Sequence, residues 1–262
     1  MKFLLHVILL LIFSSIISAK TIEENINACN NGNSADCYHL GVMYAAGVGV
    51  DRDIDEAVKW LLKSANQGSA NAQLVLGVMY ANGDGVVQDK DGAVDWFMKS
   101  AKQGNASAQY KLGIIYAIGD DVEKSKEDAA MWLEKSAKQG NADAQFNLGV
   151  LYFSGDGVAQ DKKEAVKWYT KSATQEHAAA QYYLGFLYAV GDGVEQDKQE
   201  AVKWLTKSAK QGNAPAQFNL GVMYFNGNGV VEDKDKAVEL FRASASQGMG
   251  DAISALNRMD LE

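Results

Sequence analysis

The chain of 262 residues has little proline, cysteine and histidine, with one Pro, two Cys and three His. Because Pro215 is the sole proline, long helices are permitted and proline-rich linkers are absent. Apart from His6, the only histidines are His39 and His177, which argues against a metal centre built from clustered ligands. The formal net charge is −8 and no basic block occurs, so nucleic acid is excluded as the expected partner.

Long apolar runs are also scarce, and the one that occurs lies at the N-terminus. It extends from Phe3 to Phe13 after Lys2, and a segment that ends in the small residues Ser18 and Ala19 follows it. This order is typical of a secretory signal peptide, which we assign to residues 1–19. A retained membrane anchor is the alternative, but a span needs ~20 apolar residues and His6 interrupts this run. We therefore predict an exported protein, periplasmic or secreted, without membrane insertion after cleavage.

What the sequence has in abundance is internal repetition, with a period of 36 residues. A Gly preceded by Leu occurs at positions 41, 77, 113, 149, 185 and 221. All five Trp share a second register, at positions 60, 96, 132, 168 and 204, and Leu240 takes the sixth place. Six copies without an insertion predict a stacked array, because one such unit cannot bury its apolar faces alone.

Each unit is predicted to hold two helices. In the second unit the apolar spacing predicts a first helix over Ala70–Ala81, ended by Gly83, which can adopt positive φ. Asp89 is placed to cap a second helix that runs to about Lys102. Three units add an acid that predicts a reciprocal capping box, in the pairs Asp53/Glu56, Asp161/Glu164 and Asp197/Glu200.

The predicted fold class is all-α, an α/α solenoid superhelix of helix-turn-helix repeats with a partial capping helix at each end. We place the N-terminal capping helix at 20–33 and a C-terminal capping half-repeat at 249–262. The six repeats are placed at 34–68, 69–104, 105–140, 141–176, 177–212 and 213–248. Two departures from the period are expected to alter the packing locally: Asp121 in a turn, and Glu176-His177 in place of Gly-Asn between two repeats.

The repeated pattern is A-x-x-x-L-G-x-x-Y-x-x-G-x-G-V-x-x-D-x-x-x-A-x-x-W-x-x-K-S-A-x-Q-G-N, over about Ser34–Gly248. It resembles the Sel1-like repeat, an α/α unit related to the tetratricopeptide repeat. The resemblance implies a protein-interaction scaffold, often secreted or periplasmic in bacteria, that serves signalling, envelope functions or host contact. We expect a protein partner, a monomeric chain and no cofactor.

The two cysteines fall on registers of the repeat, Cys29 on that of Ala65 and Cys37 on that of Gln73. This arrangement is similar to that of the cysteine-rich Sel1-like proteins of Helicobacter, in which such pairs are disulfides. The resemblance implies a Cys29–Cys37 disulfide that fastens the N-terminal cap to the first repeat, as an oxidising compartment allows. Two free thiols in a chain retained in the cytosol are the alternative.

An enzymatic function is the main alternative, because some relatives have been described as β-lactamases. A penicillin-binding or β-lactamase-like enzyme needs the motifs S-x-x-K, S-D-N and K-T-G, and none of them occurs. The Ser of each K-S-A is better explained as a small packing residue, and the G-D-G-V turns lack the alternating acids of a calcium loop. We predict no catalytic residue and no metal site. A eukaryotic secretory-pathway adaptor, with a sequon at Asn105, is a further alternative.

Three registers of the first helices vary from repeat to repeat while their neighbours do not. They begin at Ala35, His39 and Ala46, and offsets of four and seven place them on one helical face. First helices line the concave side of stacked α/α arrays, so this face is the predicted partner-binding surface. Random drift at exposed positions is the alternative. The candidate binding residues are His39, Asn82, Lys111, Asn147, Tyr183, Asn219 and Asn226.

Overall fold

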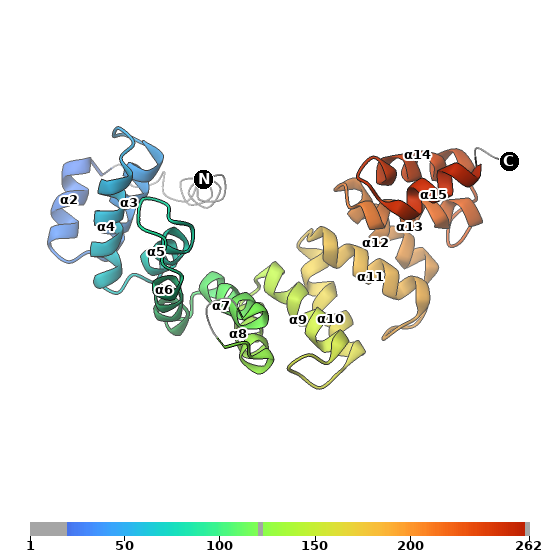
Figure 1. The fold of residues 1–262 in the computed structure, drawn as a ribbon, viewed down its shortest axis with the longest axis horizontal. Helices are drawn as coiled ribbons and strands as arrows, with labels where there is room; N and C mark the ends of the chain where they lie inside the picture. The colour runs from blue at the N-terminus through green and yellow to red at the C-terminus, as the bar shows by residue number, and fades with distance from the viewer. Residues whose placement is uncertain (1–19, 120–122, 260–262) are drawn as a thin grey trace. The chain divides into compact units, whose positions relative to one another are not determined.

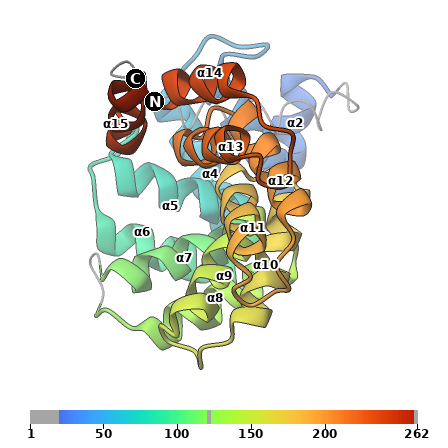
Figure 2. The same ribbon diagram turned by 90° about the vertical axis from the view of Figure 1, so that its right-hand side faces the viewer.

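The structure is a computed structural model, and it describes residues 20–119 and 123–259. Throughout these residues the regular structure is helical, with fourteen α-helices and no strand (Figures 1 and 2). None of the described helices is both long and apolar enough to cross a membrane. The predicted signal peptide, 1–19, and Asp121 lie outside the described residues. The chain divides into two units, 1–124 and 125–262, which are described separately.

The first unit contains the N-terminal cap and the first two and a half repeats. Its helices are α2 (Ile22–Asn30), α3 (Ser34–Ala46), α4 (Ile54–Asn66), α5 (Ala70–Asn82), α6 (Lys90–Lys102) and α7 (Ala106–Ile118). Within this unit each helix packs against the next one in the chain, from α2 to α7. The predicted helical cap and helix-turn-helix repeats are therefore present in this unit.

The second unit continues the alternation of first and second helices. Its helices are α8 (Lys126–Lys138), α9 (Ala142–Ser154), α10 (Lys162–Thr174), α11 (Ala178–Val190), α12 (Lys198–Lys210), α13 (Ala214–Asn226), α14 (Lys234–Ala245) and α15 (Gly250–Met259). Here too, from α8 to α15, each helix packs against the next one in the chain, and α11 also contacts α13, the first helix of the following repeat. The third repeat is divided, because its first helix belongs to the first unit and its second helix to the second.

The turn inside the second repeat follows the predicted chemistry. Gly83 ends α5 with φ of 75°, and the amide of Asp84 donates to the carbonyl of Met79 at 3.0 Å. The carboxylate of Asp89 then accepts a hydrogen bond from the amide of Gly92 at 3.0 Å and caps α6. The predicted helix stop and N-cap are confirmed.

The predicted reciprocal capping boxes are wrong. The backbone N–H of Asp53 donates to the carbonyl of Tyr44 at 3.0 Å, so it is not available to the Glu56 side chain. Glu56 instead pairs with Lys59 at 2.9 Å. The same replacement occurs at the other two sites, where the N–H groups of Asp161 and Asp197 bond the carbonyls of Tyr152 and Tyr188. A capping box does form in the N-terminal cap, between Thr21 and Glu24.

Close packing within each repeat depends on the Gly of the Leu-Gly pair. A Cβ added at Gly77 would lie 2.6 Å from the ring of Phe97, and one at Gly149 would lie 2.8 Å from the ring of Tyr169. Both partners stand on the second helix of the same repeat. Glycine therefore lets the first helix lie directly against the second.

Two buried polar registers also join the helices. Ser100 is fully buried, and its hydroxyl donates to the carbonyl of Ala70 at 2.7 Å. Gln103 donates to the side-chain oxygen of Gln73 at 2.7 Å, and Gln73 donates to the carbonyl of Ala65 at 3.1 Å. The first two bonds lie within one repeat and the third reaches the repeat before it. The Ser of K-S-A thus makes a buried hydrogen bond in addition to packing closely.

Candidate partner-binding surface

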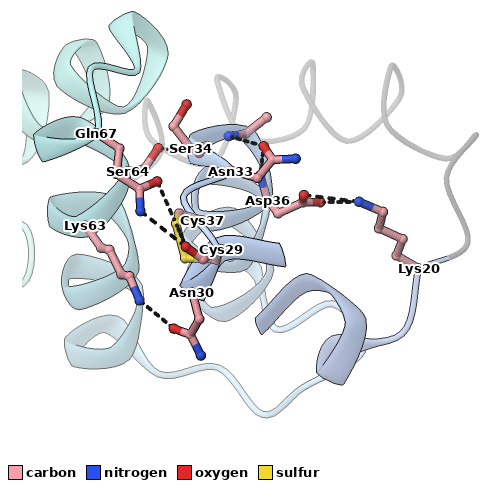
Figure 3. Close-up of a disulfide and its surroundings, with 11 residues drawn as sticks. Lys20, Cys29, Asn30, Asn33, Ser34, Asp36, Cys37, Lys63, Ser64 and Gln67 are labelled. Atoms are coloured by element: carbon pink, nitrogen blue, oxygen red, sulfur yellow. Dashed lines mark hydrogen bonds and ion pairs between the residues drawn. A yellow bond between two sulfur atoms is a disulfide. The ribbon is translucent and has the colours of Figure 1, made fainter. Parts of the chain in front are cut away.

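The N-terminal cap is held to the first repeat by covalent and polar contacts (Figure 3). Cys29 of α2 and Cys37 of α3 form a disulfide with Cα atoms 4.8 Å apart, and both residues are fully buried. The side-chain amide of Gln67 donates to the carbonyl of Cys29 at 3.2 Å, which ties the cap to α4. Lys20 adds an ion pair to Asp36 at 3.0 Å.

The candidate binding residues of the first unit differ in exposure. Asn82 is exposed, and its side chain donates to the Asp84 carboxylate at 3.3 Å. His39 and Lys111 are half-buried. Val75, on the same register, is only 6% exposed and belongs to the core. This variable register is therefore not exposed in every repeat, because Val75 packs against its neighbours.

In the second unit, aromatic side chains gather where α9 and α11 meet. The ring of Tyr183 on α11 lies 5.6 Å from that of Phe146 on α9. It also stacks at 5.6 Å on Tyr169 of α10, which is almost fully buried. On its other side Phe146 stacks on His177 at 4.8 Å. A partly exposed cluster of rings is thereby built upon a buried tyrosine.

The cluster extends along α11 through Tyr182 and Phe186, whose rings are 6.5 Å apart. Tyr183 is 39% exposed, Phe186 40% and Val190, one turn further on, 51%. We call Phe146, His177, Tyr182, Tyr183 and Phe186 the aromatic band. Large apolar side chains that stay open to solvent side by side mark a surface suited to a partner.

Asparagine side chains border the aromatic band. Asn219 on α13 hydrogen-bonds Tyr182, and the pKa of Tyr182 is nevertheless raised, mainly by burial and secondly by Tyr183. Asn147, next to Phe146, donates to the carbonyl of Asp143 at 2.8 Å within its own helix. Asn226 likewise donates to Val222 at 2.9 Å. Asn147, Tyr183 and Asn219 therefore lie at the band, whereas Asn226 lines a separate pocket near α15.

The substitution of Glu176-His177 for Gly-Asn shapes one end of the aromatic band, so the expected local change in packing is present. Glu176 has φ of 62°, a left-handed conformation that glycine adopts at the equivalent positions of other repeats. His177 replaces Asn as the N-cap of α11, and its Nδ1 accepts from the amide of Ala180 at 3.1 Å. Its Nε2 lies 3.3 Å from a carboxylate oxygen of Asp143.

Sequence reasoning missed Phe146, Tyr182 and Phe186 as surface residues. Phe146 and Tyr182 share one register, which lies outside the three variable registers of the predicted binding face. The available signal was the density of rings in α11, whose sequence is AAAQYYLGFLYAV. Such a density exceeds what one half-buried helix needs for its core.

The described residues contain no group of three or more His, Cys, Asp and Glu placed to hold a metal ion. Two turn carboxylates instead pair with lysines of the preceding repeat, Asp156 with Lys126 and Asp192 with Lys162. The latter pair is 2.8 Å apart. These turns contribute contacts between repeats.

The helices and their registers define a class, the α/α solenoids built from stacked repeats. The Sel1 repeat model matches residues 34–69, 70–105, 106–141, 142–177, 178–213 and 214–249. The chain belongs to the Sel1 repeat family, and the predicted fold class and family are confirmed. Proteins of this family are generally scaffolds without catalytic activity that mediate protein interactions.

Solved structures give the same result. The chain is similar to c5321, a protective antigen of uropathogenic Escherichia coli, with 36% identity and a TM-score of 0.83 over 89% of this chain and 50% of that one. It thus spans half the length of the Escherichia coli protein. A Sel1 repeat protein from Oxalobacter formigenes is 32% identical, with a TM-score of 0.71 over 81% of this chain and 85% of that one. A comparison with curated proteins finds no match.

Proposed function

We propose that this chain is an exported monomeric scaffold, without catalytic activity, that binds a protein partner through the aromatic band. The observation that carries the proposal is the exposure of Tyr183 and Phe186, at 39% and 40%, beside a buried aromatic support. Aromatic residues held rigidly at a surface commonly dominate the energy of protein interfaces. The asparagines at its edge supply hydrogen-bonding groups for the rim of such an interface.

Two observations support export. The N-terminal sequence has the order of a secretory signal, and Cys29 and Cys37 form a disulfide, as proteins in oxidising compartments commonly do. The similar Escherichia coli protein is described as a protective antigen of uropathogenic strains, and this description supports a role in host contact. An envelope or secreted role in host contact is therefore the proposed setting.

The aromatic band can be tested by capture of partners from envelope and host extracts. Phe186→Ala combined with Val190→Ala removes exposed apolar surface while the stack of Tyr183 on Tyr169 remains. Val87→Ala combined with Val231→Ala is the control, because these turn valines are 87% and 85% exposed and are not part of the band. We expect the first variant to capture at least about tenfold less partner, with an unchanged melting temperature. Equal capture by both variants would contradict the proposal.

Export is tested separately by cell fractionation and intact mass. Cleavage after Ala19 should yield a chain that begins at Lys20, with both cysteines resistant to alkylation unless reduced. A full-length chain in the cytosolic fraction would contradict export while leaving the binding proposal standing.

A further inference from the structure

A pocket of about 490 Å³ opens between α13, α14 and α15, and no residue of the aromatic band lines it. Its volume falls within the range of small ligand sites, about 300–1,000 Å³. The residues that matter here are Phe218, Val222, Phe241, Ser254, Ala255 and Arg258.

The repeat itself explains why this space is open. Phe218 and Phe241 are two periods beyond Phe146 and Tyr169, and the two ring pairs have similar separations, 5.6 and 5.8 Å. In the earlier repeat Tyr183 covers its pair, lying 5.6 Å from both rings. The residue two periods beyond Tyr183 is Ala255, which has no ring to place there.

A second substitution enlarges the same space. Ser254 is two periods beyond Tyr182, on a register that holds Tyr, Leu or Phe in all six repeats. Two adjacent small residues on α15 therefore line a space beside Phe218 and Phe241, whereas Tyr183 covers the equivalent rings of the earlier repeat. The pocket has the position that the Tyr183 ring takes in the earlier repeat.

Charge at the pocket favours one kind of ligand. Arg258 is one helical turn from Ala255 and lines the pocket, and it makes no hydrogen bond or ion pair within the described parts of the chain. Asp251 lines it one turn to the other side of Ala255. Arg258 and Asp251 thus lie on opposite sides of Ala255. An acidic group beside an inserted ring can therefore pair with the guanidinium only on the Arg258 side of the pocket.

We propose that this pocket binds an aromatic side chain of a protein partner, with an acidic residue next to it that pairs with Arg258. The inserted ring takes the place relative to Phe218 and Phe241 that Tyr183 takes relative to Phe146 and Tyr169. This site extends the proposed scaffold function, and it can be tested whether or not the aromatic band binds a partner.

The probe is a blocked peptide of sequence Gly-Tyr-Glu-Gly, titrated into the full chain and followed by NMR chemical shifts. We expect a dissociation constant near or below about 1 mM, with shifts in α13 and α15. Replacing Tyr by Ala in the peptide should weaken binding at least about tenfold. Replacing Glu by Gln should weaken it for the wild-type chain but not for Arg258→Gln.

The decisive variant is Ala255→Tyr, which places the missing ring in the chain itself. It should abolish peptide binding and raise the melting temperature, because the new side chain fills the pocket. Ile253→Tyr is the matched control, since Ile253 is on α15, 42% exposed, and not part of the pocket lining. The Phe186→Ala and Val190→Ala variant should bind the peptide as wild type does.

Three results would overturn the proposal: no binding to the wild-type chain, equal binding of the Tyr and Ala peptides, or unchanged binding to Ala255→Tyr. If Ala255→Tyr does not fold, the peptide series on the wild-type chain and on Arg258→Gln decides alone. Loss of partner capture through the aromatic band with retained peptide binding would separate the two sites.

Discussion

Restoring the repeat pattern at the cysteine pair should separate the disulfide's contribution from that of the hydrogen bonds around it. Cys29 stands where later repeats have Ala, and Cys37 where they have Gln. In the second repeat that Gln, Gln73, donates to Ala65 and accepts from Gln103. The disulfide therefore replaces a polar connection with a covalent one at the same place in the fold.

The free energy by which the disulfide stabilises the fold follows from the short loop that it closes. For a sequence separation of 8, the chain-entropy model gives about 2.5 kcal/mol of stabilisation. Cys29→Ala with Cys37→Ala should lose this amount. Cys29→Ala with Cys37→Gln should recover about 1–3 kcal/mol, because the introduced amide can form two hydrogen bonds like those of Gln73.

Hydrogen exchange resolved along the chain is the appropriate assay, because each repeat is stabilised mainly by its neighbours. In the double-Ala variant, protection of α2 should fall by roughly 60-fold, the equivalent of about 2.5 kcal/mol. Helices α9–α15 should be unaffected, and the Ala/Gln variant should regain most of the protection. Unchanged protection of α2 in the double-Ala variant would refute the role of the disulfide as a staple.

Three further predictions concern the scaffold. Gly77→Ala should destabilise the chain by about 1 kcal/mol in denaturant unfolding, because overpacking against Phe97 at 2.6 Å outweighs the gain in helix propensity. Gly250→Ala, with open space around it, should not destabilise. Ser172→Ala should cost about 1 kcal/mol, since it removes a fully buried hydrogen bond of 2.7 Å. Burial raises the pKa of Tyr38 from 10.0 to about 12, so its contribution is intact below pH 10 and up to about 2.7 kcal/mol is lost as the pH rises through 12. Tyr38→Phe should flatten this alkaline loss in unfolding curves recorded on either side of pH 10, and an unchanged pH dependence would refute the assignment.

Most of the fold was predictable because its determinants are local and repeated. Gly83 ends a helix and Asp89 begins the next through contacts within a few residues, which a sequence shows directly. The capping boxes failed for a non-local reason: the N–H of Asp53 is taken by Tyr44, across the turn. A pattern of four residues does not reveal that competition.

The candidate surface was predictable only in part, because it depends on which registers meet across repeats. Tyr183 was found through its variability. Phe146 was not, because its register carries large side chains throughout and resembles scaffold. Their contact joins positions 37 apart, on helices whose proximity follows from stacking rather than from the period alone.

Departures from the period proved more informative than variation within it. His177, in place of Asn, caps α11 and also places a ring against Phe146, so one substitution serves both the scaffold and the aromatic band. Ala255, in place of a larger side chain, leaves the rings beneath it uncovered. In an array of identical units every surface repeats, so a partner can be bound at one location only where the repetition is broken. Such breaks are therefore the positions at which binding specificity should be sought first.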